Sequence, residues 1–150
     1  MTIRPYQEKD NDKIIKLADR FSAIPFMTHR NQEDMEQKQL ELAKKAISSR
    51  SSDIFVAEEN DNFLGYIELT EVSDYFTTDS VAYISAIAVT HAGEGKGIGK
   101  QLMEKADQWC LAKGCKYLAL DVFTANEQAI NFYNHLGYQA EIVKMVKSPK

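Results

Sequence analysis

The sequence has few cysteines, no long hydrophobic run and no excess of positive charge. Its two cysteines, Cys110 and Cys115, stand apart from any Cys/His cluster of metal-site spacing, so neither a disulfide framework nor a bound metal is expected. No apolar run approaches the roughly 20 residues that cross a bilayer, and the N-terminus lacks a signal-peptide core. A formal net charge of −4 gives no general attraction to nucleic acid. These absences favour a cytoplasmic protein without nucleic-acid or membrane partners.

The size and composition fit one globular domain. A single core typically serves roughly 100 to 200 residues, and this chain has 150. Its 44% hydrophobic and 27% charged residues are typical of a folded globular protein. Because no internal repeat, low-complexity tract or linker interrupts the sequence, residues 1–150 are expected to form a single domain.

Hydrophobic periodicity predicts a chain that mixes strands and helices. The expected strands are residues 2–6, 54–58, 63–72, 81–89, 117–123 and, as a closing strand or strands, 138–146. The expected helices are residues 11–21, 32–49, 98–113 and 127–136. A strand, helix and strand in succession from residue 81 to 123 form a β-α-β crossover, which predicts parallel or nearly parallel neighbouring strands.

The stretch from Ile87 to Leu102 passes from an apolar strand through a glycine-rich loop into a helix. Glycine has no Cβ, so such a loop lets main-chain N–H groups approach a ligand closely. The first turn of the following helix adds unpaired N–H donors and the positive end of the helix dipole. The loop is therefore expected to bind a phosphorylated ligand through its four alternating glycines, Gly93, Gly95, Gly97 and Gly99.

Two common phosphate-binding loops do not fit these residues. The dinucleotide fingerprint needs Gly-x-Gly-x-x-Gly, and spacing by twos does not supply the last interval. A P-loop ending at Gly99-Lys100 would need glycine at position 94 and Ser or Thr at position 101. The sequence has Glu94 and Gln101 there, which also disfavours a nucleotide-binding phosphotransferase.

Two motifs resemble the GCN5-related N-acetyltransferase (GNAT) family. The run Glu94-Gly95-Lys96-Gly97-Ile98-Gly99 resembles its acyl-CoA-binding motif, Arg or Gln, x, x, Gly, x, Gly or Ala, and departs from it only at Glu94. Residues 126–138 resemble its pattern Asn-x-x-Ala-x-x-Phe-Tyr, three residues, then Gly-Phe or Gly-Tyr, at every named position. The motifs stand in the family's order within a resemblance that covers roughly residues 54–145.

The resemblance implies the α/β GNAT fold, a central mixed sheet flanked by about four helices, and acetyl-CoA as the cofactor. In the family the strand before the loop and the strand after the next helix splay apart, and the cofactor arm lies in the gap. The positions that would bind the cofactor are Ile87, Ala88, Val89, Glu94, Gly95, Lys96, Gly97, Ile98, Gly99, Lys100, Asn126 and Tyr133. Tyr133 also matches the position that protonates the departing thiolate.

Acetyl transfer to an amine through a tetrahedral intermediate needs a neutral amine, a donor for the developing oxyanion and a proton for the thiolate. Main-chain N–H groups of residues 84–89 are candidates for the oxyanion donor, and Tyr133 for the acid. The candidate bases are Glu68, Asp121 and Glu71, of which Glu68 is ranked first.

The implied enzyme is an acetyl-CoA-dependent N-acetyltransferase whose acceptor is a small-molecule or protein amine. The alternative is a non-catalytic acyl-CoA sensor or interaction module of the same fold. Residues 21–50 and 73–80 are expected to shape the acceptor pocket and carry no signature of a particular acceptor. Many members of the family pair as dimers, so a homodimer is left open.

Overall fold

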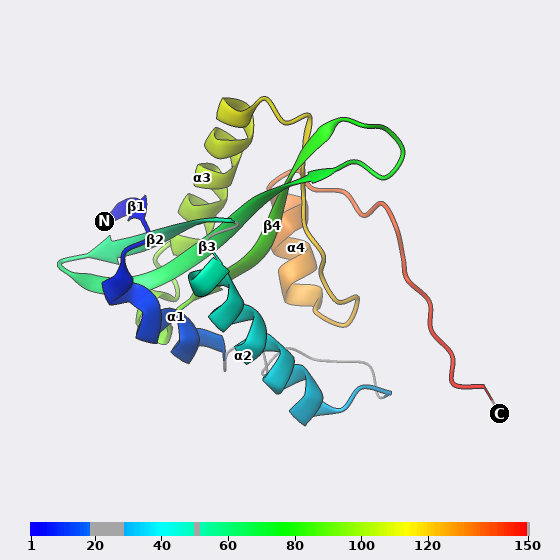
Figure 1. The fold of residues 1–150 in the computed structure, drawn as a ribbon, viewed down its shortest axis with the longest axis horizontal. Helices are drawn as coiled ribbons and strands as arrows, with labels where there is room; N and C mark the ends of the chain where they lie inside the picture. Colours follow the sequence, from blue (N-terminus) through cyan, green and yellow to red (C-terminus); the bar gives the residue numbers. More distant parts are fainter. Residues whose placement is uncertain (19–28, 50–51, 150) are drawn as a thin grey trace.

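The computed structural model describes residues 1–18, 29–49 and 52–149, which contain five strands and four α-helices (Figure 1). The strands are β1 (Thr2–Pro5), β2 (Asp53–Glu59), β3 (Asn62–Ser73), β4 (Ser80–Val89) and β5 (Tyr117–Ala119). The α-helices are α1 (Asn11–Leu17), α2 (Gln32–Ser49), α3 (Ile98–Lys113) and α4 (Glu127–His135), and 3-10 helices η1 (Glu8–Asp10) and η3 (His91–Gly93) precede α1 and α3. The expected continuation of the first helix to residue 21 lies outside the described residues.

The five strands form one mixed sheet in the order β1-β2-β3-β4-β5. Strands β1 to β4 are antiparallel to their neighbours, whereas β5 runs parallel to β4. Helix α3 connects β4 to β5, so the predicted β-α-β crossover is confirmed. The sheet and its helices match the α/β fold class that the sequence predicted.

Helices cover both faces of the sheet, with α3 and α4 on one side and α1 and α2 on the other (Figure 1). The larger core lies under α3, where buried Ile67 and Leu69 of β3 pack with Leu102. The smaller core lies under α1, where Ile14 packs with Val56 and Tyr66. Alternate residues of β3 therefore enter different cores, as the two-residue period of a strand requires.

Helix α3 forms the main support of the sheet because its apolar residues recur at helical spacing. Ile98, Leu102, Ala106 and Trp109 are all buried, and the predicted core position of Cys110 is confirmed. Gly114 ends the helix in the left-handed region, with φ of 70°. Helix α2 is different: Ala43 is its one buried residue, so it packs lightly and exposes most of its length.

Two predicted strands differ from the structure. The strand expected at residues 117–123 ends at Ala119, because beyond the pair Tyr83 and Ala119 the chain no longer pairs with β4. The closing strand expected at residues 138–146 is wrong, since these residues form no strand. Their apolar residues give them the composition of a strand, but no neighbouring strand in the described part of the chain pairs with them.

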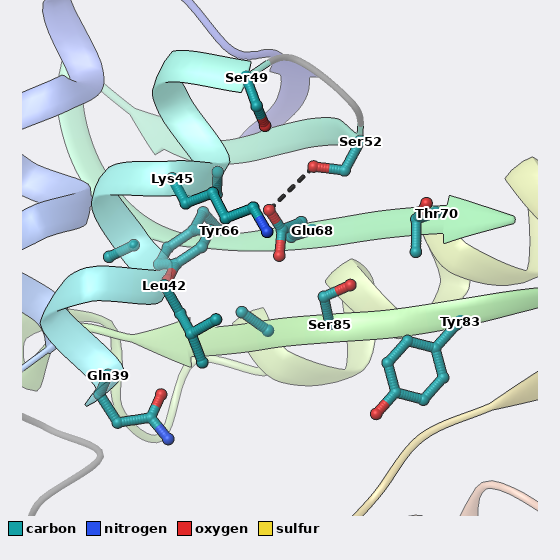
Figure 2. Close-up of a pocket in the computed structure, with 13 residues that line it drawn as sticks. Gln39, Leu42, Lys45, Ser49, Ser52, Tyr66, Glu68, Thr70, Tyr83 and Ser85 are labelled. Carbon is teal, nitrogen blue, oxygen red and sulfur yellow. Dashed lines mark hydrogen bonds between the residues drawn. The ribbon is translucent and has the colours of Figure 1, made fainter. Parts of the chain in front are cut away.

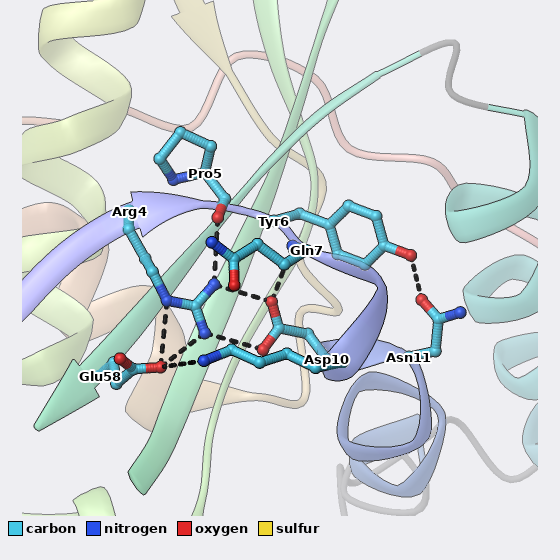
Figure 3. Close-up of polar contacts among 8 residues, drawn as sticks. Arg4, Pro5, Tyr6, Gln7, Asp10, Asn11 and Glu58 are labelled. Carbon is cyan, nitrogen blue, oxygen red and sulfur yellow. Dashed lines mark hydrogen bonds and ion pairs between the residues drawn. The ribbon is translucent and has the colours of Figure 1, made fainter. Parts of the chain in front are cut away.

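A charge network joins β1, η1 and β2 (Figure 3). The Arg4 guanidinium donates to both carboxylate oxygens of Asp10, at 2.8 and 2.9 Å, and to Glu58 at 2.6 Å. Asp10 is 1% exposed and also accepts the Gln7 N–H at 2.9 Å. Burial by itself would raise the pKa of Asp10, but the bonds from Arg4 and Gln7 hold it below the ordinary value of 3.8. Asp10 is thus a buried anion rather than a simple helix cap.

Replacing Arg4 with leucine is expected to destabilise the fold by about 3 kcal/mol at neutral pH, because Asp10 becomes a buried charge without its cation. Because the pKa of Asp10 is lower in the folded protein than in the unfolded one, its ionised form stabilises the fold at pH values above the unfolded-state pKa. This stabilisation is lost as the pH falls through the folded-state pKa. The deficit of Arg4→Leu should therefore shrink as the pH drops below 3.8. Urea unfolding at several pH values measures it.

The matched control is Lys9→Met, which removes an exposed cation 3.6 Å from Glu58. Its effect should stay below about 1 kcal/mol, as for other exposed ion pairs. Equal losses for the two variants would show that the Arg4 network contributes no more than surface charge.

Candidate functional site

A gap opens beside β4 where its pairing with β5 ends. Strand β5 pairs with β4 only from Val81 to Tyr83, while β3 continues to pair with β4 as far as Val89. The Thr90 N–H donates to Leu64 O on β3, and successive N–H groups of a strand point to opposite sides. The N–H groups of Val89 and Ile87 therefore face the gap. Main-chain donors line its β4 side.

The glycine loop leads from this gap to the N-terminus of α3. Gly95 and Gly97 have φ of 75° and 72°, a region that disfavours residues with a Cβ, and no atom lies within 4 Å of where a Cβ would stand on either. The first bond of the helix runs from Gln101 N–H to Gly97 O, so the N–H groups of the preceding helical residues lack an intrahelical acceptor. These donors fit an anionic group such as a diphosphate.

The loop side chains lie around these main-chain donors rather than among them. Ile98 is buried in the core, so only its main chain is available at the loop. The Glu94 carboxylate lies 3.4 Å from His91 Nδ1, and Lys96 Nζ lies 3.8 Å from Glu59. All four of these side chains are at least 41% exposed, so the acidic residue at position 94 is solvated on the loop surface.

Helix α4 carries the two candidate residues of the second motif. Asn126 is its N-cap, and its side-chain oxygen accepts the Ala129 N–H at 3.3 Å. Tyr133 is half-buried between Phe132 and Tyr138, with ring centroids 5.3 and 5.8 Å away. Burial raises the pKa of its phenol, which keeps the phenol protonated at neutral pH.

A pocket of about 370 Å³ lies on the opposite face of the sheet, between α2 and strands β3 and β4 (Figure 2). Glu68 lines it and accepts a hydrogen bond from Ser52 Oγ at 2.8 Å. Burial raises the pKa of Glu68 and outweighs the opposing hydrogen bonds from Ser52 and Ser85. From α2, Lys45 reaches across the pocket towards this carboxylate. A base with a raised pKa is suited to accept a proton near neutral pH.

A β-bulge shapes the pocket floor. Glu68 pairs with Ala86 and Leu69 with Ile84, so Ser85 is an extra residue in β4. The bulge lets Ser85 reach the Glu68 carboxylate from the neighbouring strand. Sequence reasoning missed Ser85 and Ser52, because neither bulges nor the position of a residue beside a distant strand leave a local sequence signal.

The other two candidate bases are placed differently. Glu71 lies an odd number of residues from Glu68 on β3, so its side chain belongs to the opposite face, where it accepts from Ser80 Oγ at 2.9 Å. Asp121 accepts the Tyr83 hydroxyl at 2.5 Å at the point where β4 and β5 separate. Of the three carboxylates, Glu68 is the one that lines the pocket.

The described ranges contain no helix long and apolar enough to cross a membrane. They also contain no group of three or more His, Cys, Asp or Glu side chains placed to hold a metal ion. His91 and His135 are exposed and lie on different elements.

Comparison with known proteins identifies the class. The profile described as "Acetyltransferase (GNAT) family" matches residues 13–138. The chain is 24% identical over 141 residues to the uncharacterized N-acetyltransferase YhfO of Bacillus subtilis, covering 94% of this chain and 91% of that protein. It spans 34% to 55% of the length of three further curated relatives.

Solved structures share the fold. A putative acetyl transferase from Pyrococcus furiosus superposes with a TM-score of 0.79 at 29% identity, covering 99% of both chains. The aminoglycoside N-acetyltransferase AAC(6')-Iy in complex with CoA gives a TM-score of 0.72 at 18% identity, covering 99% of this chain and 93% of that one. The chain therefore belongs to the GNAT family of acetyltransferases. Like other members, it is an acetyl-CoA-dependent acetyltransferase.

Replacing Gly97 with alanine is expected to weaken CoA binding about tenfold, which is the equivalent of one lost charge-assisted hydrogen bond. The reason is that alanine cannot keep the left-handed conformation of Gly97 without strain, so the loop shifts. Folding stability should fall by about 1 kcal/mol. Calorimetric titration with CoA and urea unfolding measure the two effects separately.

Gly114→Ala is the matched control, because Gly114 has φ of 70° and equally open space but ends α3 far along the chain from the loop. Its stability loss should equal that of Gly97→Ala while CoA affinity stays unchanged. Equal CoA affinity in both variants would contradict the assignment of the glycine loop as the site that binds the diphosphate of CoA.

Proposed function

We propose that the protein transfers the acetyl group of acetyl-CoA to a primary amine of a small molecule or protein, by direct attack through a tetrahedral intermediate. The observation that carries this proposal is the placement of Tyr133 and Glu68. Tyr133 packs on the α3 side of the sheet and Glu68 lines the pocket on the α2 side. The gap beside β4 lies between the two faces, so donor and acceptor can meet there from opposite sides.

The coenzyme would lie along the gap with its diphosphate at the glycine loop. The main-chain N–H groups of Ile87 and Val89 then bind the arm, and those from Gly95 to Lys100 bind the diphosphate. The Asn126 side-chain oxygen is occupied as a cap, which leaves its NH₂ group to donate to the arm. The fold shared with a CoA-bound aminoglycoside acetyltransferase supports this direction.

Proton transfers would be divided between the two faces. Glu68 accepts a proton from the incoming ammonium and so generates the nucleophilic amine. An N–H of β4 that faces the gap stabilises the oxyanion. Tyr133 donates its phenolic proton to the departing thiolate, and its hydroxyl forms no hydrogen bond to any other described residue that would compete.

The acceptor class follows from the pocket lining. The Glu68 carboxylate accepts hydrogen bonds, and the oxygens of Tyr66, Tyr83 and Ser85 can accept as well, which suits an ammonium group with polar neighbours; Lys45 adds one positive charge to the lining. Relatives named for streptothricin, thialysine and protein N-alpha acetylation act on small-molecule and protein amines. A panel of such amines, with thiol release as the signal, tests the proposal. CoA binding without thiol release from any amine would instead favour a non-catalytic acyl-CoA module.

Replacing Tyr133 with phenylalanine should lower turnover about 100-fold, the usual contribution of a positioned general acid, with little change in thermal stability. The control is Tyr138→Phe, since the Tyr138 hydroxyl is buried in the same cluster without a hydrogen-bond partner in the described chain. Removing that hydroxyl should leave turnover unchanged and stability equal or higher. Full turnover in Tyr133→Phe with a good acceptor would refute its role as the acid.

The rate is expected to fall on the acid side of the pH profile as Glu68 becomes protonated. Because burial raises the pKa of Glu68, this limb should lie above the ordinary glutamate value of 4.5. In Glu68→Gln the limb should disappear and the maximal rate drop. Glu71 lies on the other face of β3, so the variant Glu71→Gln should retain the wild-type pH profile. If the acid limb were lost in Glu71→Gln and kept in Glu68→Gln, Glu71 and not Glu68 would be the base.

A further inference from the structure

The pocket between α2 and strands β3 and β4 is lined by one acid and one base. Among the described residues that line it, Glu68 of β3 is the only carboxylate and Lys45 of α2 is the only cation (Figure 2). The other lining side chains are neutral. An acceptor with several ammonium groups would need an acidic or polar partner for each of them. One carboxylate fits an acceptor that carries a single ammonium group.

The Lys45 ammonium group has no ionic partner among the described residues. On the same helix Lys38 pairs with Glu41 at 3.8 Å, but no ion pair joins Lys45 to Glu68 or to another described carboxylate. The pKa of Glu68 is raised by burial and opposed by hydrogen bonds from two serines, with no contribution from Lys45. Two opposite charges therefore share one pocket without contacting each other. A ligand that carries both complementary charges can bind between them.

The third feature of this pocket is an apolar wall on α2. Leu42, Ala43 and Ala46 line the pocket from this helix. Leu42 is 44% exposed, so an apolar group that enters the pocket can cover surface that water covers in the free protein. The volume of about 370 Å³ lies near the lower end of the range for small-molecule pockets, which is roughly 300 to 1,000 Å³. The pocket thus fits a small acceptor with an apolar part.

We propose that the acceptor is a free α-amino acid with an apolar side chain, an inference that rests on the proposed function of this pocket. The ammonium group of the amino acid binds the Glu68 carboxylate, its own carboxylate binds the Lys45 ammonium group, and its side chain packs on Leu42. Lys45 is thereby the residue that selects an acceptor with a carboxylate beside the amine.

The products are an N-acetylated amino acid and CoA. The amine nitrogen forms a bond to the carbonyl carbon of the acetyl group, and the C–S bond of the thioester breaks. One proton of the ammonium group goes to Glu68 before the attack. A second proton leaves the nitrogen as the amide forms, and it replaces the proton that Tyr133 gives to sulfur.

Steady-state kinetics with L-leucine, L-leucinamide and 3-methylbutylamine tests the inference. These acceptors share one apolar side chain, but the second has a neutral amide in place of the carboxylate and the third has neither. The KM for leucine should be about tenfold lower than for the other two, the equivalent of one hydrogen bond between charged groups. The carboxylate of leucine favours the protonated amine, so leucinamide is the more easily deprotonated acceptor. A preference for leucine therefore comes from recognition by the pocket.

Variants of Lys45 assign this preference to one side chain. In Lys45→Met the ratio of the leucinamide KM to the leucine KM should fall from about ten to about one, whereas Lys45→Arg should keep most of it. The matched control is Lys44→Met, because Lys44 is an exposed neighbour on α2 that does not line the pocket. It removes the same charge and should keep the wild-type ratio.

Three results would overturn the inference. Equal KM values for leucine and leucinamide in the wild-type protein would show that the carboxylate is not recognised, and acetylation of both would leave the proposed function in place. If Lys45→Met kept the ratio but moved the acid limb of the pH profile equally for both acceptors, Lys45 would act on Glu68 and not on the acceptor. If none of the three amines released thiol, the amino acid class would be wrong, and the proposed function would fail as well only if the wider amine panel were also silent.

Discussion

The candidate site depends on strand β4, which along part of its length pairs with a neighbour on one side only. If β4 had a neighbouring strand along both sides of its whole length, all its N–H groups would be hydrogen-bonded within the sheet, and none could bind a ligand. Because β5 stops pairing after Ala119, the donors of Ile87 and Val89 face a gap instead. Unpaired main-chain donors away from water are costly, so the fold tolerates them only where a ligand or water can accept them. The interruption that weakens the sheet also creates the surface that we propose binds the coenzyme.

Burial raises the pKa of both proposed proton-transfer groups, but the two shifts have different consequences for the reaction. It raises the pKa of Glu68, so a carboxylate becomes a better proton acceptor. It also raises the pKa of Tyr133, which makes the phenol a weaker acid. A thiol has a reference pKa of about 8.5, below that of phenol, but a thiolate released into the same desolvated environment also becomes more basic. Burial of the thiolate therefore favours proton transfer from Tyr133 to sulfur and offsets the weaker acidity of the buried phenol.

The sequence predicted the elements whose signals are local. Helix α2 begins and ends at the predicted residues, and the glycine loop and α3 follow from spacing alone. The sequence could not reveal Ser85 at the pocket, because a bulge depends on the register between two strands. It also could not reveal that Asp10 is a buried anion, because its partner Arg4 reaches it through the fold. The roles assigned to Tyr133 and Glu68 remain predictions that the geometry permits.

The main-chain groups on the two sides of β5 have different surroundings. On the side facing β4, pairing runs from Tyr117 to Ala119, and beyond it the main-chain donors of β4 have no partner on that side among the described strands. On the outer side, β5 has no neighbouring strand in the described part of the chain, and Tyr117 is exposed. The predicted closing strand was wrong because an apolar composition suggests a strand but does not specify its partner. A strand needs a pairing edge as well as an apolar pattern, and in the described part of the chain no strand pairs with residues 138–146.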